Sequence, residues 1–281
     1  MLRQRIITAI ILIAILLPSA LYPSTTPLGV VALILIAAGA WEWARMNGVE
    51  STAAVGFGLV CASLCILTWI TGLVQTPLRG FWIAMGGAWV LFGGWLLRFG
   101  VVAWRKVPVF VALLGGLIAL WAAWLAVLQA RTIGVNFLFS VLVLVWVADI
   151  FAYFFGRTFG GRFFTKKLAP SVSPGKTWEG ALGGILGVIA CVWLWRWVDD
   201  IAAVDSASLY TRLGLLGALP LTVAAIFLAA MSVVGDLVES LFKRSAGIKD
   251  SSALLPGHGG VLDRVDALLP TLPLAMMLAS L

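Results

Sequence analysis

Long apolar runs recur along almost the whole chain of 281 residues, and they constrain the fold more than any other feature. A helix needs about 20 such residues to cross a ~30 Å hydrocarbon core, and in lipid only helices and closed barrels satisfy their own backbone. Because 62% of the residues are hydrophobic and 11% are charged, there is no room for a large soluble domain. We therefore predict a single all-α domain over residues 1–281, a polytopic integral membrane bundle.

The apolar runs predict nine transmembrane spans. The first is retained as a helix because Pro18 interrupts the place where a signal-peptide cleavage site would be sought. The spans lie near residues 6–21, 28–45, 53–74, 81–98, 108–129, 135–155, 180–198, 213–235 and 262–281.

The distribution of Lys and Arg orients these spans. With the N-terminus inside, 15 of the 19 basic residues fall on the cytoplasmic side, and Arg79, Arg131, Arg196 and Arg212 fall outside. Because positively charged loops stay in the cytoplasm, the chain is predicted to be N-in and C-out. Anionic headgroups then explain the net charge of +7, so no nucleic-acid partner is expected.

Residues 231–266 form the densest polar stretch, with five of the twelve acidic residues and the only histidine, His258. If 233–244 is helical, four polar residues share one face at i, i+3, i+4 and i+7: Asp236, Glu239, Ser240 and Lys243. Asp263 and Asp266 face one side at the start of the next helix. Two acidic faces joined by a basic, glycine-rich loop indicate a metal-assisted phosphate site. Interfacial anchoring and structural ion pairing are the alternative.

A second cluster runs from Asp149 to Gly184. Asp149 near the end of an apolar span indicates either a functional site or an ion pair with a basic loop residue. The segment from Ser173 to Thr177 is not a Walker A loop, because Pro170 stands where that motif needs glycine. Thr177 or Ser173 can still cap the next helix, whose first N–H groups can bind phosphate together with Lys176.

Two sets of motifs carry a resemblance to a known family. The first comprises Ser240–Arg244, Lys249–Asp250 and Pro256–Asp266. The second comprises Asp149, Ala152-Tyr153, Gly156, Ser173-Pro174, Lys176-Thr177 and Glu179-Gly180. Together they resemble the bacterial phosphatidate cytidylyltransferase (CDP-diacylglycerol synthase) family. The resemblance covers the C-terminal half strongly, whereas the N-terminal half is similar only in hydropathy.

The resemblance implies a nucleotidyltransferase that joins CTP to phosphatidic acid in phospholipid biosynthesis. It implies a homodimer in the bacterial inner membrane with its active site facing the cytoplasm, and a Mg²⁺ centre with a second cation left open. Residues 135–281 would hold the catalytic helices and cytoplasmic loops. Residues 1–134 would serve packing, with a lipid or dimer surface.

The roles expected of individual residues follow from these two clusters. Metal ligands are expected among Asp236, Asp263, Asp266, Glu239 and Asp149. The catalytic set is Asp236, Asp263, Lys243, Lys249, Asp250 and Arg264. Substrate-binding residues are Ser173, Lys176, Thr177, Ser240, Arg244, His258, Gly259 and Gly260. His258 is expected to bind phosphate or shape the loop rather than act as a base, because phosphatidate is already ionised at neutral pH.

Two rival functions fit parts of the pattern. Many helices with buried charge also describe a transporter or channel, but here the polar groups gather at the inner face instead of at mid-membrane across paired repeats. A membrane enzyme that uses CTP on an isoprenoid alcohol is the other rival. Only the lipid acceptor separates that enzyme from a phosphatidate cytidylyltransferase.

Overall fold

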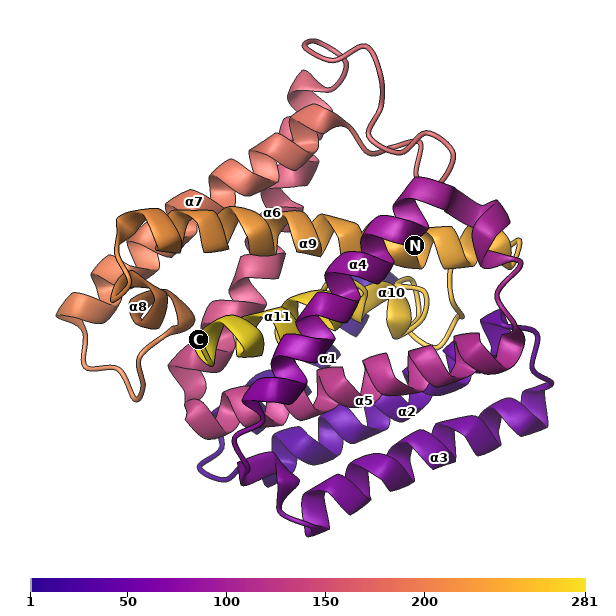
Figure 1. Cartoon of the computed structure of the whole chain (residues 1–281), viewed down its shortest axis with the longest axis horizontal. Coiled ribbons are helices and arrows are strands. Elements are labelled where there is room, and N and C mark those ends of the chain that lie inside the picture. Colours follow the sequence, from indigo (N-terminus) through magenta and orange to yellow (C-terminus); the bar gives the residue numbers. More distant parts are fainter. Residues whose placement is uncertain (1) are drawn as a thin grey trace.

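The structure is a computed structural model that describes residues 2–281, and most of these residues are helical (Figure 1). The long helices are α1 (Leu2–Leu21), α2 (Thr26–Met46), α3 (Ser51–Ile70), α4 (Arg79–Trp104), α5 (Val109–Ile133), α6 (Val135–Phe159), α7 (Trp178–Ile201) and α9 (Ala218–Ser245). The short ones are η1 (Leu73–Gln75), α8 (Leu209–Gly214), α10 (Leu262–Val265) and α11 (Leu268–Ala279). The predicted all-α membrane bundle is confirmed.

Within residues 2–281, eight helices are long and apolar enough to cross a bilayer, so the prediction of nine spans is wrong at the last one. The expected span 262–281 is divided into α10 and the 12-residue α11. Proline explains the break, because Pro270 has no N–H to donate to the carbonyl of Asp266 four residues earlier. At 1.5 Å per residue α11 extends about 18 Å, which is too short for a ~30 Å hydrocarbon core.

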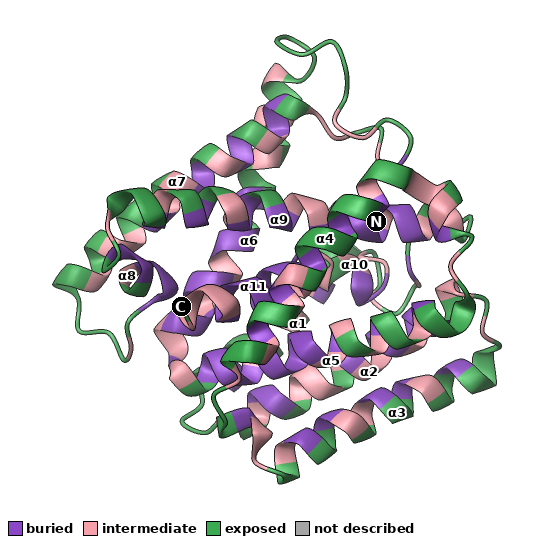
Figure 2. Cartoon of the chain, in the orientation of Figure 1, coloured by how far each residue is buried: buried purple, intermediate pink, exposed green. Residues whose placement is uncertain are grey.

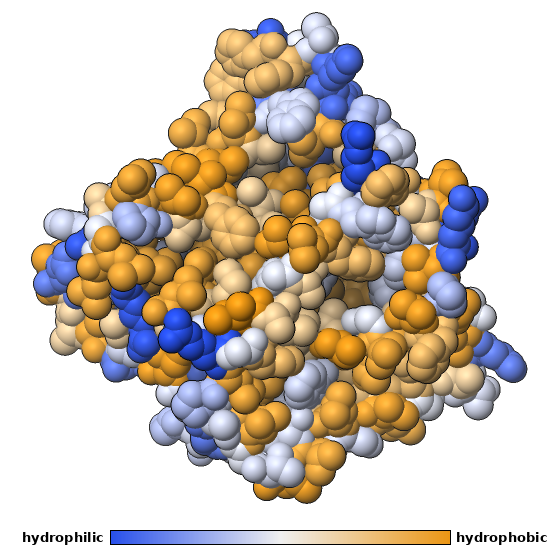
Figure 3. Space-filling view, viewed as in Figure 1, coloured by the Kyte–Doolittle hydropathy of each residue, from blue (hydrophilic) through white to orange (hydrophobic). Residues whose placement is uncertain are grey.

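The core lies where α5, α9 and α11 meet. Residues from Pro270 to Met276 of α11 are buried, and this helix packs against α4, α5 and α9. Buried residues gather there in Figure 2, whereas the outer faces of α3 and α4 are largely exposed. The face shown in Figure 3 is mostly hydrophobic, with hydrophilic residues mainly near its edges, as expected for a surface in contact with lipid.

Helices α6 and α7 form a hairpin that rises from the rest of the bundle, with the loop of residues 160–177 at its tip (Figure 1). The helices approach closely through glycines. A Cβ at Gly180 would lie 2.9 Å from the carbonyl oxygen of Ala152, and one at Gly184 would lie 2.8 Å from that of Ala148. Glycines spaced four residues apart therefore let α6 and α7 pack closely.

Candidate functional site

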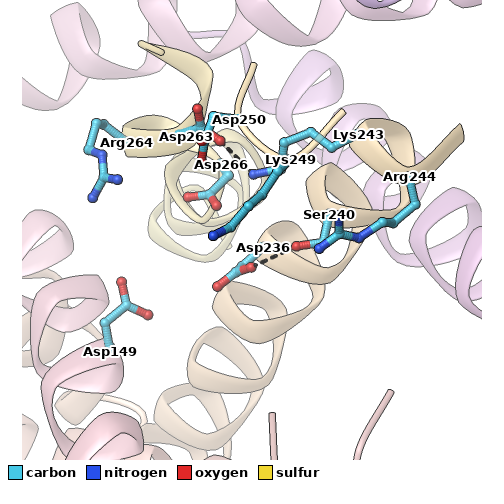
Figure 4. Close-up of a pocket in the computed structure, with 10 residues that line it drawn as sticks. All are labelled: Asp149, Asp236, Ser240, Lys243, Arg244, Lys249, Asp250, Asp263, Arg264 and Asp266. Carbon is cyan, nitrogen blue, oxygen red and sulfur yellow. Dashed lines mark hydrogen bonds and ion pairs between the residues drawn. The ribbon is translucent and has the colours of Figure 1, made fainter. Parts of the chain in front are cut away.

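The polar residues of the C-terminal half converge on one cavity of about 370 Å³. It lies between α6, α9, α10 and the loop that precedes α10 (Figure 4). Ten residues line it: Asp149, Asp236, Ser240, Lys243, Arg244, Lys249, Asp250, Asp263, Arg264 and Asp266. All ten were singled out from the sequence, and the tertiary structure brings residues 149 and 266 to the same space.

Helix α9 presents four of these side chains, Asp236, Ser240, Lys243 and Arg244, at i, i+4, i+7 and i+8. The Ser240 hydroxyl lies 3.4 Å from Asp236 Oδ1, and the Lys243 ammonium lies 2.5 Å from Asp263 Oδ1. Glu239, which was expected on the same face, does not line the cavity. It is buried, and its carboxylate lies 2.5 Å from Lys243 Nζ. Lys243 therefore joins an acidic residue of its own helix to the acidic residue of α10.

Asp263 fixes the loop before α10 as well as lining the cavity. Its Oδ2 accepts hydrogen bonds from the Ser251 amide at 2.9 Å, the Ser251 hydroxyl at 2.9 Å and the Gly260 amide at 2.8 Å. Burial raises the pKa of Asp263, but the hydrogen bonds from Lys243, Gly260 and Ser251 outweigh it and leave the pKa below its ordinary value. The carboxylate is therefore held in its ionised form.

Asp236 connects the two sequence clusters. Its Oδ2 is paired with the ammonium of Lys176, which comes from the loop between α6 and α7. Asp149 of α6 and Asp266 face the same cavity (Figure 4). Burial, the charge of Asp236 and, to a smaller extent, that of Asp149 raise the pKa of Asp266 to about 7. Three carboxylates thus repel one another here, and a cation would relieve the repulsion.

These donors fit a hard divalent cation. Lysine ammonium groups already lie beside Asp236 and Asp263, so positive charge is favourable at both carboxylates. Among residues 2–281, no three His, Cys, Asp or Glu side chains are grouped closely enough to hold a metal ion by themselves. Mg²⁺ commonly takes only one or two carboxylates and completes its shell with water and substrate phosphates.

A second cavity of about 440 Å³ lies between α6, α7 and α9 and shares Asp149 and Asp236 with the first. Lys176 and Thr177 line it, as does Tyr153. The sequence left Thr177 or Ser173 as the cap of the next helix. Thr177 is the N-cap of α7 and accepts a hydrogen bond from the Gly180 amide at 3.1 Å. The two cavities are therefore neighbours that share the Asp149 and Asp236 side chains.

Several predicted site residues line neither cavity: Ser173, Glu239, His258, Gly259 and Gly260. Three of them shape the loop before α10. Gly259 has φ +83°, which favours glycine, and Gly260 donates to Asp263. The His258 carbonyl accepts from Arg264 Nε at 2.9 Å and from its Nη2 at 2.6 Å.

Glu42 of α2 was missed by the sequence analysis. It is fully buried and contacts the loop before α10 through its carboxylate. A signal was available, because an acidic residue inside an apolar span indicates a functional site.

Comparison with known proteins identifies the family of this chain. The sequence matches the cytidylyltransferase family over residues 3–281. A phosphatidate cytidylyltransferase of Pseudomonas aeruginosa is 36% identical over 97% of this chain and 95% of its own length. One of Haemophilus influenzae is 35% identical over 97% of this chain and 96% of its own length. The resemblance seen in the sequence motifs is confirmed, and this chain belongs to the cytidylyltransferase family.

Proposed function

We propose that this protein transfers the cytidylyl group of CTP to phosphatidic acid, giving CDP-diacylglycerol and pyrophosphate for phospholipid biosynthesis. The observation that carries the proposal is the convergence of ten charged or hydroxyl-bearing side chains, from three helices and one loop, on a single cavity. A site with both signs of charge suits a nucleotide triphosphate and its cation. The relatives from Pseudomonas aeruginosa and Haemophilus influenzae, which match nearly the whole chain, are named for this reaction.

The reaction is a direct in-line displacement. An oxygen of the phosphatidate phosphate forms a bond to the α-phosphorus of CTP, while the bond from that phosphorus to the bridging oxygen breaks and pyrophosphate leaves with the electron pair. Such transfers depend mostly on positioning and charge neutralisation, so no covalent intermediate on the protein is needed. A general base is equally unnecessary, because the attacking phosphate is already ionised.

Carboxylates of the first cavity would hold the cation. Asp236 and Asp263 are the proposed Mg²⁺ ligands, with Asp149, Asp250 and Asp266 as further or water-mediated ligands. Glu239 would act through Lys243, with which it is paired. When bound, Mg²⁺ would offset the negative charge of the phosphates.

Basic residues would hold the phosphates themselves. Lys243, Arg244, Lys249 and Arg264 line the first cavity and suit the triphosphate or the lipid phosphate. Lys176 and Thr177 line the second cavity and provide another phosphate contact, next to the N-terminus of α7. Ser173 would support the turn that presents Lys176, since the Lys176 amide donates to its carbonyl at 3.1 Å.

The protein would lie in the bacterial inner membrane as an N-in homodimer with its active site facing the cytoplasm. The excess of Lys and Arg on one side supports this orientation. This excess is the same whether or not the ninth span is counted. CTP would then reach the cavity from the cytosol, while phosphatidic acid comes from the inner leaflet.

The direct test uses purified protein in detergent with α-labelled CTP. We expect label to enter a lipid product only when phosphatidic acid and Mg²⁺ are both added, with release of one pyrophosphate per product. Incorporation with an isoprenoid alcohol instead of phosphatidic acid would assign the rival CTP-dependent reaction. Absence of incorporation with either acceptor, from protein that is folded and monodisperse, would contradict the proposal.

A further inference from the structure

We propose that Glu42, in the N-terminal half, is a positioning residue for the transfer reaction: it holds the loop of residues 251–262 in the conformation that places Asp263 at the cavity. The inference rests on the function proposed above. Glu42 lines neither cavity, so it would act through the loop rather than on substrate.

All four hydrogen bonds to the Glu42 carboxylate come from this one loop. Oε1 accepts from the Ser252 hydroxyl at 2.5 Å and from the Val261 amide at 2.9 Å. Oε2 accepts from the Leu262 amide at 2.8 Å and from the Ser251 hydroxyl at 3.1 Å, whose one proton it shares with Asp263 Oδ2. These bonds connect residues more than 200 positions apart in the sequence. A single side chain of α2 therefore joins both ends of the loop.

The contacts lead directly to Asp263. The hydroxyl of Ser251 lies within hydrogen-bond distance of both Glu42 and Asp263 Oδ2, at 3.1 and 2.9 Å. The amides of Val261 and Leu262 lie at the start of α10, where a helix has N–H groups without intrahelical partners. Glu42 satisfies these two amides and so fixes the short helix that carries Asp263.

Close packing at Gly260 adds to this restraint. A Cβ at Gly260 would lie 2.3 Å from Glu42 Oε1 and 2.1 Å from the Ser251 hydroxyl. The loop backbone therefore lies so close to the Glu42 carboxylate that only glycine fits at this position. The backbone amide of Gly260 donates to Asp263, so Gly260 contacts both Glu42 and Asp263.

A carboxylate suits this position better than an amide. The side chain is fully buried, and burying a charge is costly unless hydrogen bonds compensate for it. The amides of Val261 and Leu262 donate to different oxygens of Glu42, and a backbone N–H cannot become an acceptor. In Glu42→Gln the NH₂ group would face one of these donors, which would leave a buried N–H without an acceptor.

The experiment compares purified Glu42→Gln with wild-type protein in detergent. We expect kcat to fall about tenfold or more, as for partners that orient metal ligands, while KM for phosphatidic acid changes less than about twofold. Amide hydrogen exchange should rise within residues 249–262 and stay unchanged in α3 and α7. Glu50→Gln is the matched control, because Glu50 is exposed at the start of α3, and its kcat and exchange should equal those of the wild type.

Ser252→Ala removes one of the four hydrogen bonds and keeps the inference testable if Glu42→Gln does not fold. It should lower kcat by a smaller factor and raise exchange in the same segment. A kcat within twofold of the wild type together with unchanged exchange at 249–262 would overturn the inference, as would increased exchange spread over all helices. Hydrogen exchange is measured without substrate, so it tests the effect of Glu42 on the loop even if the wild-type protein shows no cytidylyl transfer. Absence of that transfer would contradict only the proposed function.

Discussion

Two lysines lie against the acidic residues that are proposed to bind the cation. Lys176 is paired with Asp236, and Lys243 is paired with Asp263. The hydrogen bond from Lys243 helps to keep the pKa of Asp263 below its ordinary value, and an ionised carboxylate is the form that a cation requires. With nucleotide and Mg²⁺ bound as proposed, the same ammonium groups would lie next to the phosphates. Each lysine would therefore stabilise a carboxylate in the free protein and a phosphate in the complex.

Asp263→Asn should lower cytidylyl transfer by a factor on the order of 100. Donors face both oxygens of Asp263, so the NH₂ group of the asparagine would oppose either Lys243 or the Ser251 and Gly260 amides. Initial rates with labelled CTP measure the effect, and size-exclusion profiles check that the variant is folded. Retention of more than half the wild-type rate would remove Asp263 from the site.

Asp266 should make the metal-free protein less stable as pH rises. Its pKa of about 7 in the folded state is above its ordinary value of 3.8, so the unfolded chain loses its proton first. The folded state is then disfavoured progressively between about pH 4 and pH 7, with no further loss above. Melting temperatures in EDTA from about pH 5 to pH 8 test this.

In those melts, Asp266→Asn should gain stability relative to the wild type as pH rises, and the difference should level off above about pH 7. Asp200→Asn, at an exposed position, serves as the control. A difference between Asp266→Asn and the wild type that does not vary with pH would show that Asp266 titrates normally.

At the scale of elements, the break between α10 and α11 packs closely against Gly235 of α9. A Cβ at Gly235 would lie 2.6 Å from the carbonyl oxygen of Asp266 and 2.7 Å from Cγ of Pro270. The break therefore rests directly on the α9 backbone, one residue before Asp236. This close approach brings Asp266 and Asp236 to one cavity.

Gly235→Ala should force α9 and the break apart, because the nearest atoms include backbone and a proline ring that cannot rotate away. We expect a loss of about 1–3 kcal/mol in the free energy of unfolding, typical of overpacking, and a loss of activity larger than stability alone explains. Melting curves and initial rates measure both. Gly87→Ala is the control, since a Cβ there meets open space, and an equal effect of the two variants would contradict the packing argument.

At the scale of the whole molecule, the N-terminal helices α1 and α2 contact the loop of residues 251–262, which contains most of the motif Pro256–Asp266. Besides Glu42, the Thr8 hydroxyl donates to the Pro256 carbonyl at 2.8 Å, and Arg5 Nε donates to that of Gly257 at 3.0 Å. Asp149 and Asp236 precede the ends of α6 and α9 by ten and nine residues, or about 14 Å at 1.5 Å per residue. The cavity is thus set into the bundle below these helix ends.

The orientation of the bundle can be tested by cysteine labelling. In a protein without its three native cysteines, Thr165→Cys lies in the exposed loop after α6 and Ala203→Cys in the exposed loop after α7. A maleimide that cannot cross membranes should label Ala203→Cys in intact cells, but Thr165→Cys only after permeabilisation. The reverse pattern would invert the topology and place the cavity away from cytosolic CTP.

From the amino-acid sequence alone we could predict the class of fold, most helix positions and the ten residues around the first cavity. Apolar runs fix helices because the bilayer leaves the backbone few alternatives. Charged residues in so apolar a chain are few, so those near helix ends were already candidates for the site. Local caps such as Thr177 were also predictable, because they depend on neighbouring residues.

How distant segments meet became clear only from the packing of the helices against one another. Pro270 interrupts the helix locally, but hydropathy does not register this and predicted a ninth span there. The tertiary structure adds that the break packs against Gly235 of α9. Glu42 meets its partners across more than 200 residues, and no local pattern specifies such a contact. Glu239 shares a helix with Asp236 but is buried beside Lys243, because burial depends on which neighbour covers each face. Helical periodicity sets which side chains lie together on one element, whereas packing between elements sets which of them reach the cavity.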